Sequence, residues 1–261
     1  MSASLEIRRV TAISSKALRM CLCMCVLAAS AAAYRGACGQ APPAPVAQTA
    51  PAAPQARFMV VLDAAHGGDD PGGKLTDGEP EKTFDLALSV RLRSLLGARG
   101  MQVVTTRESD ATMDASRRAE IANHANAQAC LSLHASESGS GVHLFVSSLA
   151  PIEPTRFTPW RTAQAAWVTR SLALAGVLNS ALLHAGMSVT LGRTSLPVVD
   201  SMSCPAVAVE IAPESAQATA PGQPPTAELN DPAYQARVAE AIAAAMLQWK
   251  ADAGRTEARN P

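Results

Sequence analysis

Short apolar runs alternate regularly with amphipathic segments between positions 58 and 249, and this pattern limits the folds that the chain can adopt. The apolar runs predict strands at 58–62, 101–106, 130–133, 142–146 and 206–209. Apolar side chains at helical spacing predict helices at 84–96, 114–125, 163–184 and 234–249. Strands separated by helices imply one α/β domain, in which a twisted, largely parallel or mixed central sheet is flanked by helices.

The N-terminal segment has the order of a secretory signal. Four basic residues between positions 8 and 19 precede an apolar stretch, 20–33, that ends in small residues. We therefore expect residues 1–33 to direct export to the periplasm or cell envelope and then to be removed, which leaves no stable membrane span. An uncleaved membrane anchor is the alternative.

Residues 34–56 are rich in Ala and Pro and predict an extended linker, because they offer too little apolar bulk to fold. The folded catalytic domain is expected at 57–250, followed by a flexible tail at 251–261. Cys38 follows Gly36 and Ala37 as a lipid-attachment cysteine would. Arg35 stands where such a signal prefers an apolar residue, so a lipid anchor is the disfavoured alternative.

Charge and cysteine content narrow the function classes. Basic and acidic residues balance at 22 each, so no surface suited to nucleic acid is expected, and we predict a monomer. Cys130 and Cys204 each open an apolar run beyond the signal. Buried free thiols are the favoured interpretation, and a disulfide between neighbouring strands in an oxidising compartment is the alternative.

Three predicted strands are each followed by a residue that can bind a metal or move a proton: His66, His134 and Glu210. In open α/β sheets such residues converge at the carboxyl ends of the strands. A carboxylate that closes an apolar run, as Glu210 does, is costly to bury unless it is paired or used. Two imidazoles and one carboxylate form a known catalytic zinc set.

Several motifs carry a resemblance to a known family. They are 61–68 (VLDAAHGG), 70–72 (DPG), 81–82 (EK), 106–110 (TRESD), 118–123, 132–135 (SLHA), 205–210 (PAVAVE) and a closing helix at 229–249. In order and spacing they resemble the zinc-dependent N-acetylmuramoyl-L-alanine amidases. The resemblance covers the region from Phe58 to Trp249.

The resemblance implies that His66, Glu81 and His134 bind Zn²⁺ and that Glu210 is the catalytic carboxylate. Glu79 competes with Glu81 for the ligand role, but the spacing from His66 favours Glu81. The implied substrate is peptidoglycan, cleaved at the amide between N-acetylmuramic acid and L-alanine. A zinc peptidase acting on another amide of the stem peptide is an alternative that the same fold and metal set would allow.

The sequence departs from the family after Glu210. Residues 211–215 (IAPES) replace a Gly- or Thr-led aromatic segment, and Pro213 must reshape this loop. We expect altered affinity or rate, and a catalytically impaired protein that serves as a peptidoglycan-binding module is the second function considered. The segment 147–161 is too short for the regulatory helix insertion of some relatives, which predicts a site that is open without an activating partner.

Other polar residues have structural interpretations. Asp63 is expected either to steady a metal ligand or to serve only the fold. Arg107 and Arg118 are expected to form structural ion pairs, with binding of a substrate carboxylate as the alternative. His124 and His143 match no ligand position of the family and are taken as ordinary.

Overall fold

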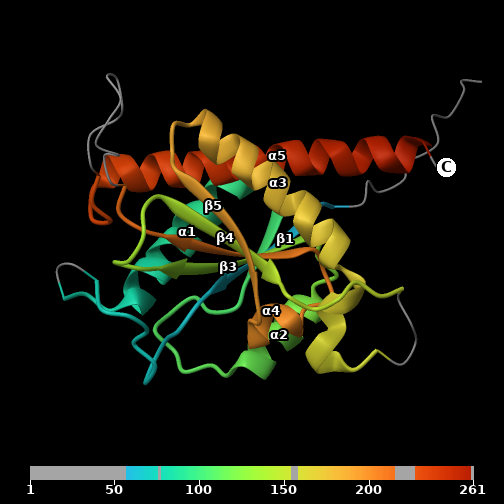
Figure 1. Cartoon of the computed structure of the whole chain (residues 1–261), viewed down its shortest axis with the longest axis horizontal. Coiled ribbons are helices and arrows are strands. Elements are labelled where there is room, and N and C mark those ends of the chain that lie inside the picture. The colour runs from blue at the N-terminus through green and yellow to red at the C-terminus, as the bar shows by residue number, and fades with distance from the viewer. Residues whose placement is uncertain (1–56, 76–77, 154–157, 215–226, 260–261) are drawn as a thin grey trace, which may run out of the picture. The chain divides into compact units, whose positions relative to one another are not determined.

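The computed structural model describes residues 57–75, 78–153, 158–214 and 227–259. These residues form one mixed sheet with helices on both faces (Figure 1), which confirms the predicted fold class. The predicted signal peptide and linker, 1–33 and 34–56, lie outside the described residues and stay predictions.

The sheet has six strands in the order β2-β1-β3-β6-β4-β5. The strands are β1 (Met59–Ala64), β2 (Gln102–Thr105), β3 (Ala129–Ala135), β4 (Val142–Ser147), β5 (Val189–Thr194) and β6 (Ala206–Ile211). Only β4 and β6 pair antiparallel, whereas the other neighbours are parallel. The start of β4 therefore lies at the same edge of the sheet as the ends of β1, β3 and β6.

The helices form two layers, one on each face of the sheet. They are α1 (Glu81–Ala98), α2 (Ala115–His124), the 3₁₀ segment η1 (Trp160–Ala166), α3 (Val168–His184), α4 (Pro197–Asp200) and α5 (Pro232–Arg259). Figure 1 shows α3 and α5 on one side of the strands and α2 and α4 on the other. Helix α1 packs with α5 and belongs to the first layer.

Strand alternation determines which side chains reach each layer. Leu131 and Leu133 of β3 and Val209 of β6 point into the large core beneath α1, α3 and α5. Cys130 and Ala208, which adjoin Leu131 and Val209 in sequence, point into the smaller core beneath α2 and α4. Because successive side chains alternate faces, His134 and Glu210 lie on the α2 and α4 face.

Some element boundaries differ from the sequence prediction. The expected helix at 163–184 is divided at Trp167 (φ −117°), where the chain bends by 67° between η1 and α3. Strand β5 was not predicted. It lies at the edge of the sheet with mostly exposed or half-buried side chains, so it lacks an apolar run. Helix α5 continues to Arg259, through part of the segment assigned to a flexible tail.

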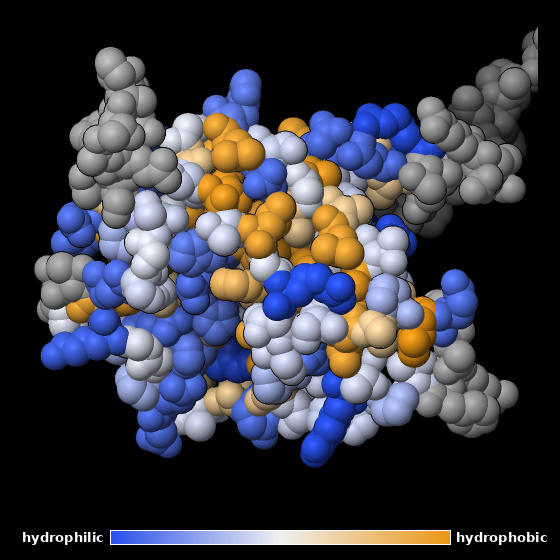
Figure 2. All heavy atoms as spheres, viewed as in Figure 1, coloured by the Kyte–Doolittle hydropathy of each residue, from blue (hydrophilic) through white to orange (hydrophobic). Residues whose placement is uncertain are grey.

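The outer surface of α3 is partly apolar. Leu172 and Leu183 are 44% and 52% exposed, and Figure 2 shows apolar side chains gathered over this helix. Among the described residues, no single helix is long and apolar enough to cross a membrane. The bent pair formed by η1 and α3 meets that test jointly, by length and composition alone.

Cys130 and Cys204 form a disulfide, so the favoured interpretation of free thiols is wrong. Cys130 lies in β3, and Cys204 lies just before β6, the next strand in the sheet. Both are fully buried in the core beneath α2 and α4. The pairing follows from the β3–β6 register, which the sequence does not display.

Candidate active site

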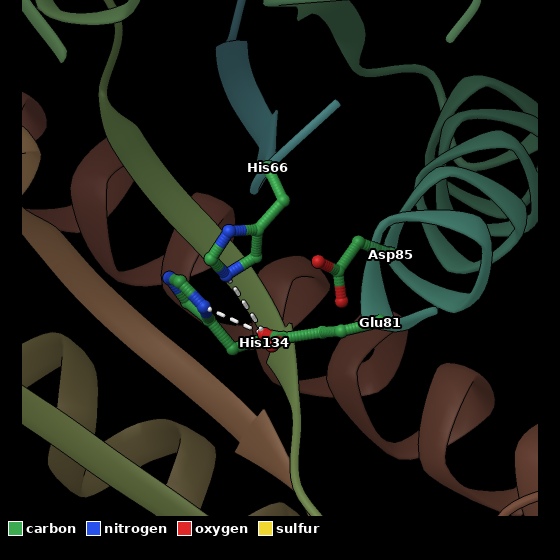
Figure 3. Close-up of side chains that lie close together, drawn as sticks. All are labelled: His66, Glu81, Asp85 and His134. Atoms are coloured by element: carbon green, nitrogen blue, oxygen red, sulfur yellow. Dashed lines mark hydrogen bonds and ion pairs between the residues drawn. The ribbon is translucent and has the colours of Figure 1, made fainter. Parts of the chain in front are cut away.

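Four side chains meet at the carboxyl edge of the sheet. His66 follows β1, His134 lies in β3, and Glu81 and Asp85 occupy successive turns at the start of α1. One ligand atom of each lies within 4.8 Å of the others. Figure 3 shows the two imidazoles and the two carboxylates pointing toward a common centre. The structure thus brings together the predicted set of His66, Glu81 and His134, and it adds Asp85.

Glu81 contacts both imidazoles of this cluster. Its Oε1 lies 3.0 Å from His134 Nδ1 and 3.3 Å from His66 Nε2. A tetrahedral zinc site with bonds of about 2.0–2.1 Å has ligand separations of about 3.4 Å. Glu81 Oε2 accepts a hydrogen bond of 2.8 Å from the Gly73 amide. Burial opposes ionisation, but the hydrogen bonds from His134 and His66 outweigh it and lower the pKa of Glu81.

His66 is held in an unusual backbone conformation. Its φ of 55° lies in the left-handed region, which non-glycine residues seldom adopt. The following turn is closed by paired main-chain hydrogen bonds between Gly67 and Asp70. A guanidinium nitrogen of Arg118 donates to the His66 carbonyl oxygen. The surroundings therefore maintain this strained residue at the proposed site.

Asp70 orients the His66 ring. Its Oδ2 lies 2.8 Å from His66 Nδ1, so Nδ1–H donates to the carboxylate and Nε2 is left to face Glu81. A carboxylate on the far nitrogen of a metal-binding histidine fixes the tautomer and raises the basicity of the ring. Glu81 and then Asp70 raise the pKa of His66, whose hydrogen bond in turn lowers the pKa of Asp70. This role of Asp70 was not predicted from the sequence.

Asp85 gives the test of whether a cation fits here. It is fully buried, and neither carboxylate oxygen has a hydrogen-bond partner among the described residues. Burial, reinforced by the charge of Glu81, raises the pKa of Asp85 well above its usual range. Such a carboxylate is costly unless a positive charge lies beside it. A cation held by His66, Glu81 and His134 would supply that charge, so the residues fit a metal.

The backbone at Gly72 leaves room for these ligands. Gly72 has φ +69°, and a Cβ placed there would lie 2.7 Å from both Glu81 Oε2 and His66 Cδ2. Any larger residue would push on two of the proposed ligands at once. Glycine is therefore required at position 72 for two reasons: the backbone has a positive φ, and the side chains of Glu81 and His66 approach it closely.

Glu210 lies beside the cluster, not inside it. The β3–β6 register places it next to His134, and the β4–β6 register places His143 on its other side. His134, Glu210 and His143 thus form a row on one face of three neighbouring strands. Glu210 is absent from the group of four potential ligands among the described residues.

His143 was taken as ordinary because it matches no ligand position, and the structure places it against Glu210. Its Nδ1 lies 2.8 Å from Glu210 Oε1. The only sequence signal was a histidine in the second position of an apolar strand. Its relation to Glu210 depends on the antiparallel pairing of β4, which the sequence does not reveal. The His124 ring, by contrast, lies at the end of α2, where its Nδ1 is 2.9 Å from the Glu120 carbonyl oxygen.

The remaining polar residues support the backbone around His66. Arg118 pairs with Asp63 at 2.9 Å, as expected, and both are buried. Asp63 also accepts hydrogen bonds from Thr106 and Ser132, so its described contacts serve the fold. Arg107 makes no ion pair with the residues that the structure describes, and it donates instead to the main-chain carbonyl oxygens of Ala64, Ala65, Lys82 and Ser109.

The divergent loop after Glu210 is anchored over its described part. The Pro213 carbonyl oxygen accepts a hydrogen bond from the Gly141 amide, and Ala212 donates to the Gly141 carbonyl oxygen. Glu214 accepts from the amide and the hydroxyl of Ser188. Ser215 lies outside the described residues. The effect expected of this loop on rate stays a prediction.

The fold and the site together define an α/β protein with a candidate metal centre of two imidazoles and carboxylates at the carboxyl edge of a mixed sheet. The family model described as N-acetylmuramoyl-L-alanine amidase, Amidase_3, matches residues 60–248. The chain therefore belongs to this family.

Known amidases are similar to this chain in sequence and in fold. AmiA of Escherichia coli K12, an N-acetylmuramoyl-L-alanine amidase, is 38% identical over 77 residues, which are 30% of this chain and 27% of that protein. The amidase AmiC2 of Nostoc punctiforme is 26% identical with a TM-score of 0.55, covering 74% of this chain and 96% of that chain. The catalytic domain of CwlV from Paenibacillus polymyxa is 24% identical and shares the fold with a TM-score of 0.56. The match covers 74% of this chain and 97% of that chain.

Proposed function

We propose that this protein is a zinc-dependent N-acetylmuramoyl-L-alanine amidase, which hydrolyses the amide between N-acetylmuramic acid and L-alanine in peptidoglycan. Family membership supports the substrate and the bond. The observation that carries the chemistry is the meeting of His66, Glu81 and His134 at one edge of the sheet, with Glu210 on the adjoining strand.

We assign His66, Glu81 and His134 as the residues that hold Zn²⁺. His66 would bind through Nε2 and His134 through Nδ1, because these are the nitrogens that face Glu81 Oε1. When bound, zinc supplies a Lewis acid that polarises the scissile carbonyl and lowers the pKa of water. Asp70 keeps the proton of His66 on Nδ1 and thus leaves Nε2 available.

Glu210 is assigned as general base and then general acid. Its carboxylate takes one proton from the attacking water, whose oxygen forms the new bond to the carbonyl carbon. The same proton then passes to the departing amine of L-alanine as the carbon–nitrogen bond breaks. Glu210 is 31% exposed, which leaves the carboxylate accessible to water. Its position outside the group of potential ligands supports a base and not a ligand.

Digestion of purified peptidoglycan tests the reaction. The proposed enzyme frees the amino group of L-alanine, whereas a stem peptidase would free the amino group of another residue. Glu210→Gln should reduce the rate by about 10²–10⁴-fold while retaining zinc and fold. His66→Ala and His134→Ala should each release the metal, as measured by zinc content.

The alternative function gives a different pattern in the same assay. A catalytically impaired peptidoglycan-binding module would sediment with cell walls without releasing any new amine. Wild-type turnover by Glu210→Gln would remove Glu210 from the mechanism. Loss of zinc together with activity in that variant would make Glu210 a ligand.

We further propose that the protein acts after export, in the periplasm or cell envelope. Residues 1–33 have the order of a secretory signal. The Cys130–Cys204 disulfide supports an oxidising compartment. Deletion of 2–33 should leave the protein in the cytosol after cell fractionation. Recovery of that variant from the periplasm would contradict the signal assignment.

A further inference from the structure

We infer that His143 is a positioning residue for Glu210, which it holds turned away from the metal ligands and ready to act as a base. The inference rests on the catalytic role proposed for Glu210. No sequence motif indicated a role for His143. The evidence for this role is the way in which three adjoining strands, β3, β6 and β4, place their side chains.

The register determines the direction of the contact. Glu210 in β6 has His134 on one side, in β3, and His143 on the other, in β4. The hydrogen bond of 2.8 Å joins Glu210 Oε1 to Nδ1 of His143, the histidine farther from the cluster. The carboxylate is thus drawn toward β4. Its place outside the group formed by His66, Glu81, Asp85 and His134 is consistent with this pull.

The imidazole of His143 is itself held in place. Its side chain is 14% exposed, and a Cβ at Gly139 would lie 2.2 Å from Cε1 and 2.7 Å from Nε2. The Gly139 backbone, at φ +93°, therefore closes directly against the edge of the ring that faces away from Glu210. Phe145, two residues along β4, meets the ring edge-on with the centroids 6.3 Å apart. A ring enclosed in this way can fix the carboxylate that it contacts.

Two consequences follow for catalysis. One carboxylate oxygen of Glu210 accepts a hydrogen bond from His143 Nδ1–H. This hydrogen bond restricts the orientation of the Glu210 carboxylate. The carboxylate is also kept from swinging toward His134, where it would compete with water for the metal. A misplacement of about 1 Å in a catalytic group can cost on the order of 10²-fold in rate. His143 is expected to prevent a loss of that order.

Substitutions at His143 separate positioning from packing. His143→Phe keeps a ring but removes the donor, and it should lower kcat on a soluble muramoyl peptide by roughly 10²-fold with little change in KM. His143→Asn places an amide donor near the position of Nδ1 and should recover most of that loss. Zinc content and melting temperature should stay near wild type in both. His124→Phe, at an exposed helix end, is the matched control and should retain full activity.

Gly139→Ala tests the positioning of Glu210 by His143 without changing either residue. The added methyl group must displace the His143 ring, so kcat should fall as in His143→Phe while zinc is retained. In the Glu210→Gln background, His143→Phe should cause no further loss, because the carboxylate that it positions is gone. A merely structural histidine would give additive losses and a lower melting temperature, and no rescue by Asn.

The outcomes distinguish this inference from the proposed function. Wild-type kcat in His143→Phe, alongside an inactive Glu210→Gln, would overturn the positioning role alone. Full activity in Glu210→Gln would overturn the catalytic role of Glu210 and this inference with it. Equal losses in His143→Phe and His143→Asn, with zinc and stability intact, would also overturn the inference, because the donor would then be irrelevant.

Discussion

Asp70 and His66 are joined by a hydrogen bond of 2.8 Å between the carboxylate Oδ2 and the imidazole Nδ1. The bond fixes the tautomer in which Nε2 faces Glu81, the nearest carboxylate of the cluster. It also adds negative charge behind a proposed ligand, which strengthens the ring as a donor to a metal. Asp70 thus links the glycine-rich loop to the proposed metal centre.

Asp70→Asn should weaken zinc binding by roughly 10-fold, at the lower end of the range for outer-shell carboxylates. The amide keeps an acceptor for the Gly72 main chain, to which Asp70 Oδ1 is bonded, but it removes the charge. Asp69→Asn is the matched control, because Asp69 contacts Thr112 and not a histidine. Competition with a zinc chelator measures both affinities. Equal affinities in the two variants would exclude the role given to Asp70.

Gly72→Ala should damage the metal centre although no ligand is changed. The new methyl group would press on Glu81 and His66, and we expect zinc affinity to fall by roughly 10–100-fold. Gly78→Ala is the control. Gly78 has a similar φ of +76°, but its nearest neighbour is a Lys74 side-chain carbon at 3.4 Å. Both variants should lose about 1–2 kcal/mol of stability from the left-handed backbone. Only Gly72→Ala should lose zinc, as measured by metal content after dialysis.

Much of the fold is predictable from local pattern. The buried strands β1, β3 and β6 contain continuous apolar runs, and helices α1 and α2 carry apolar residues at helical spacing. Strand β5 escaped prediction because an edge strand with exposed side chains has no such run. The bend between η1 and α3 escaped as well, because the apolar pattern continues across it.

The site residues likewise fall into those that the local sequence predicts and those that it does not. His66, Glu81 and His134 could be grouped from strand ends and motif spacing. Asp85 could not, because a carboxylate inside an amphipathic helix is usually solvated, and its burial depends on how α1 meets the sheet. His143 and the Cys130–Cys204 disulfide depend on strand order and register, which are long-range properties. The sequence therefore predicted the proposed metal ligands. It did not predict the residues whose contacts with the site depend on how distant strands and helices pack together.

Asp85→Asn should have opposite effects on the metal-free and metal-loaded protein. Because the folded-state pKa of Asp85 is raised, its carboxyl group destabilises the metal-free protein increasingly as pH rises above about 4, the value in an unfolded chain. The variant should therefore melt at a higher temperature than the wild type at pH 7 without metal, and this gain should vanish near pH 4. With the charge gone, zinc affinity should fall.

Ser89→Ala provides the control for Asp85. Ser89 lies one turn further along α1, and its buried hydroxyl also lacks a described partner. Its removal should stabilise the protein equally at pH 4 and pH 7 and should leave zinc affinity unchanged. Calorimetry with and without metal makes the comparison. Unchanged zinc affinity in Asp85→Asn would place this carboxylate outside the influence of the metal.

The Cys130–Cys204 disulfide should stabilise the domain and preserve the spacing of the two strands that carry His134 and Glu210. It joins residues separated by 74 positions, and bridges of this kind contribute about 2–4 kcal/mol. Reduction should therefore lower the melting temperature by on the order of 10 °C. The double variant Cys130→Ala and Cys204→Ala should melt near the reduced wild type and should not respond to reductant. A melting temperature in the double variant equal to that of the oxidised wild type would show that β3 and β6 hold their register without the bridge. Because the bridge lies four residues before His134 in β3, the reduced protein should also lose activity at a lower temperature than the oxidised protein.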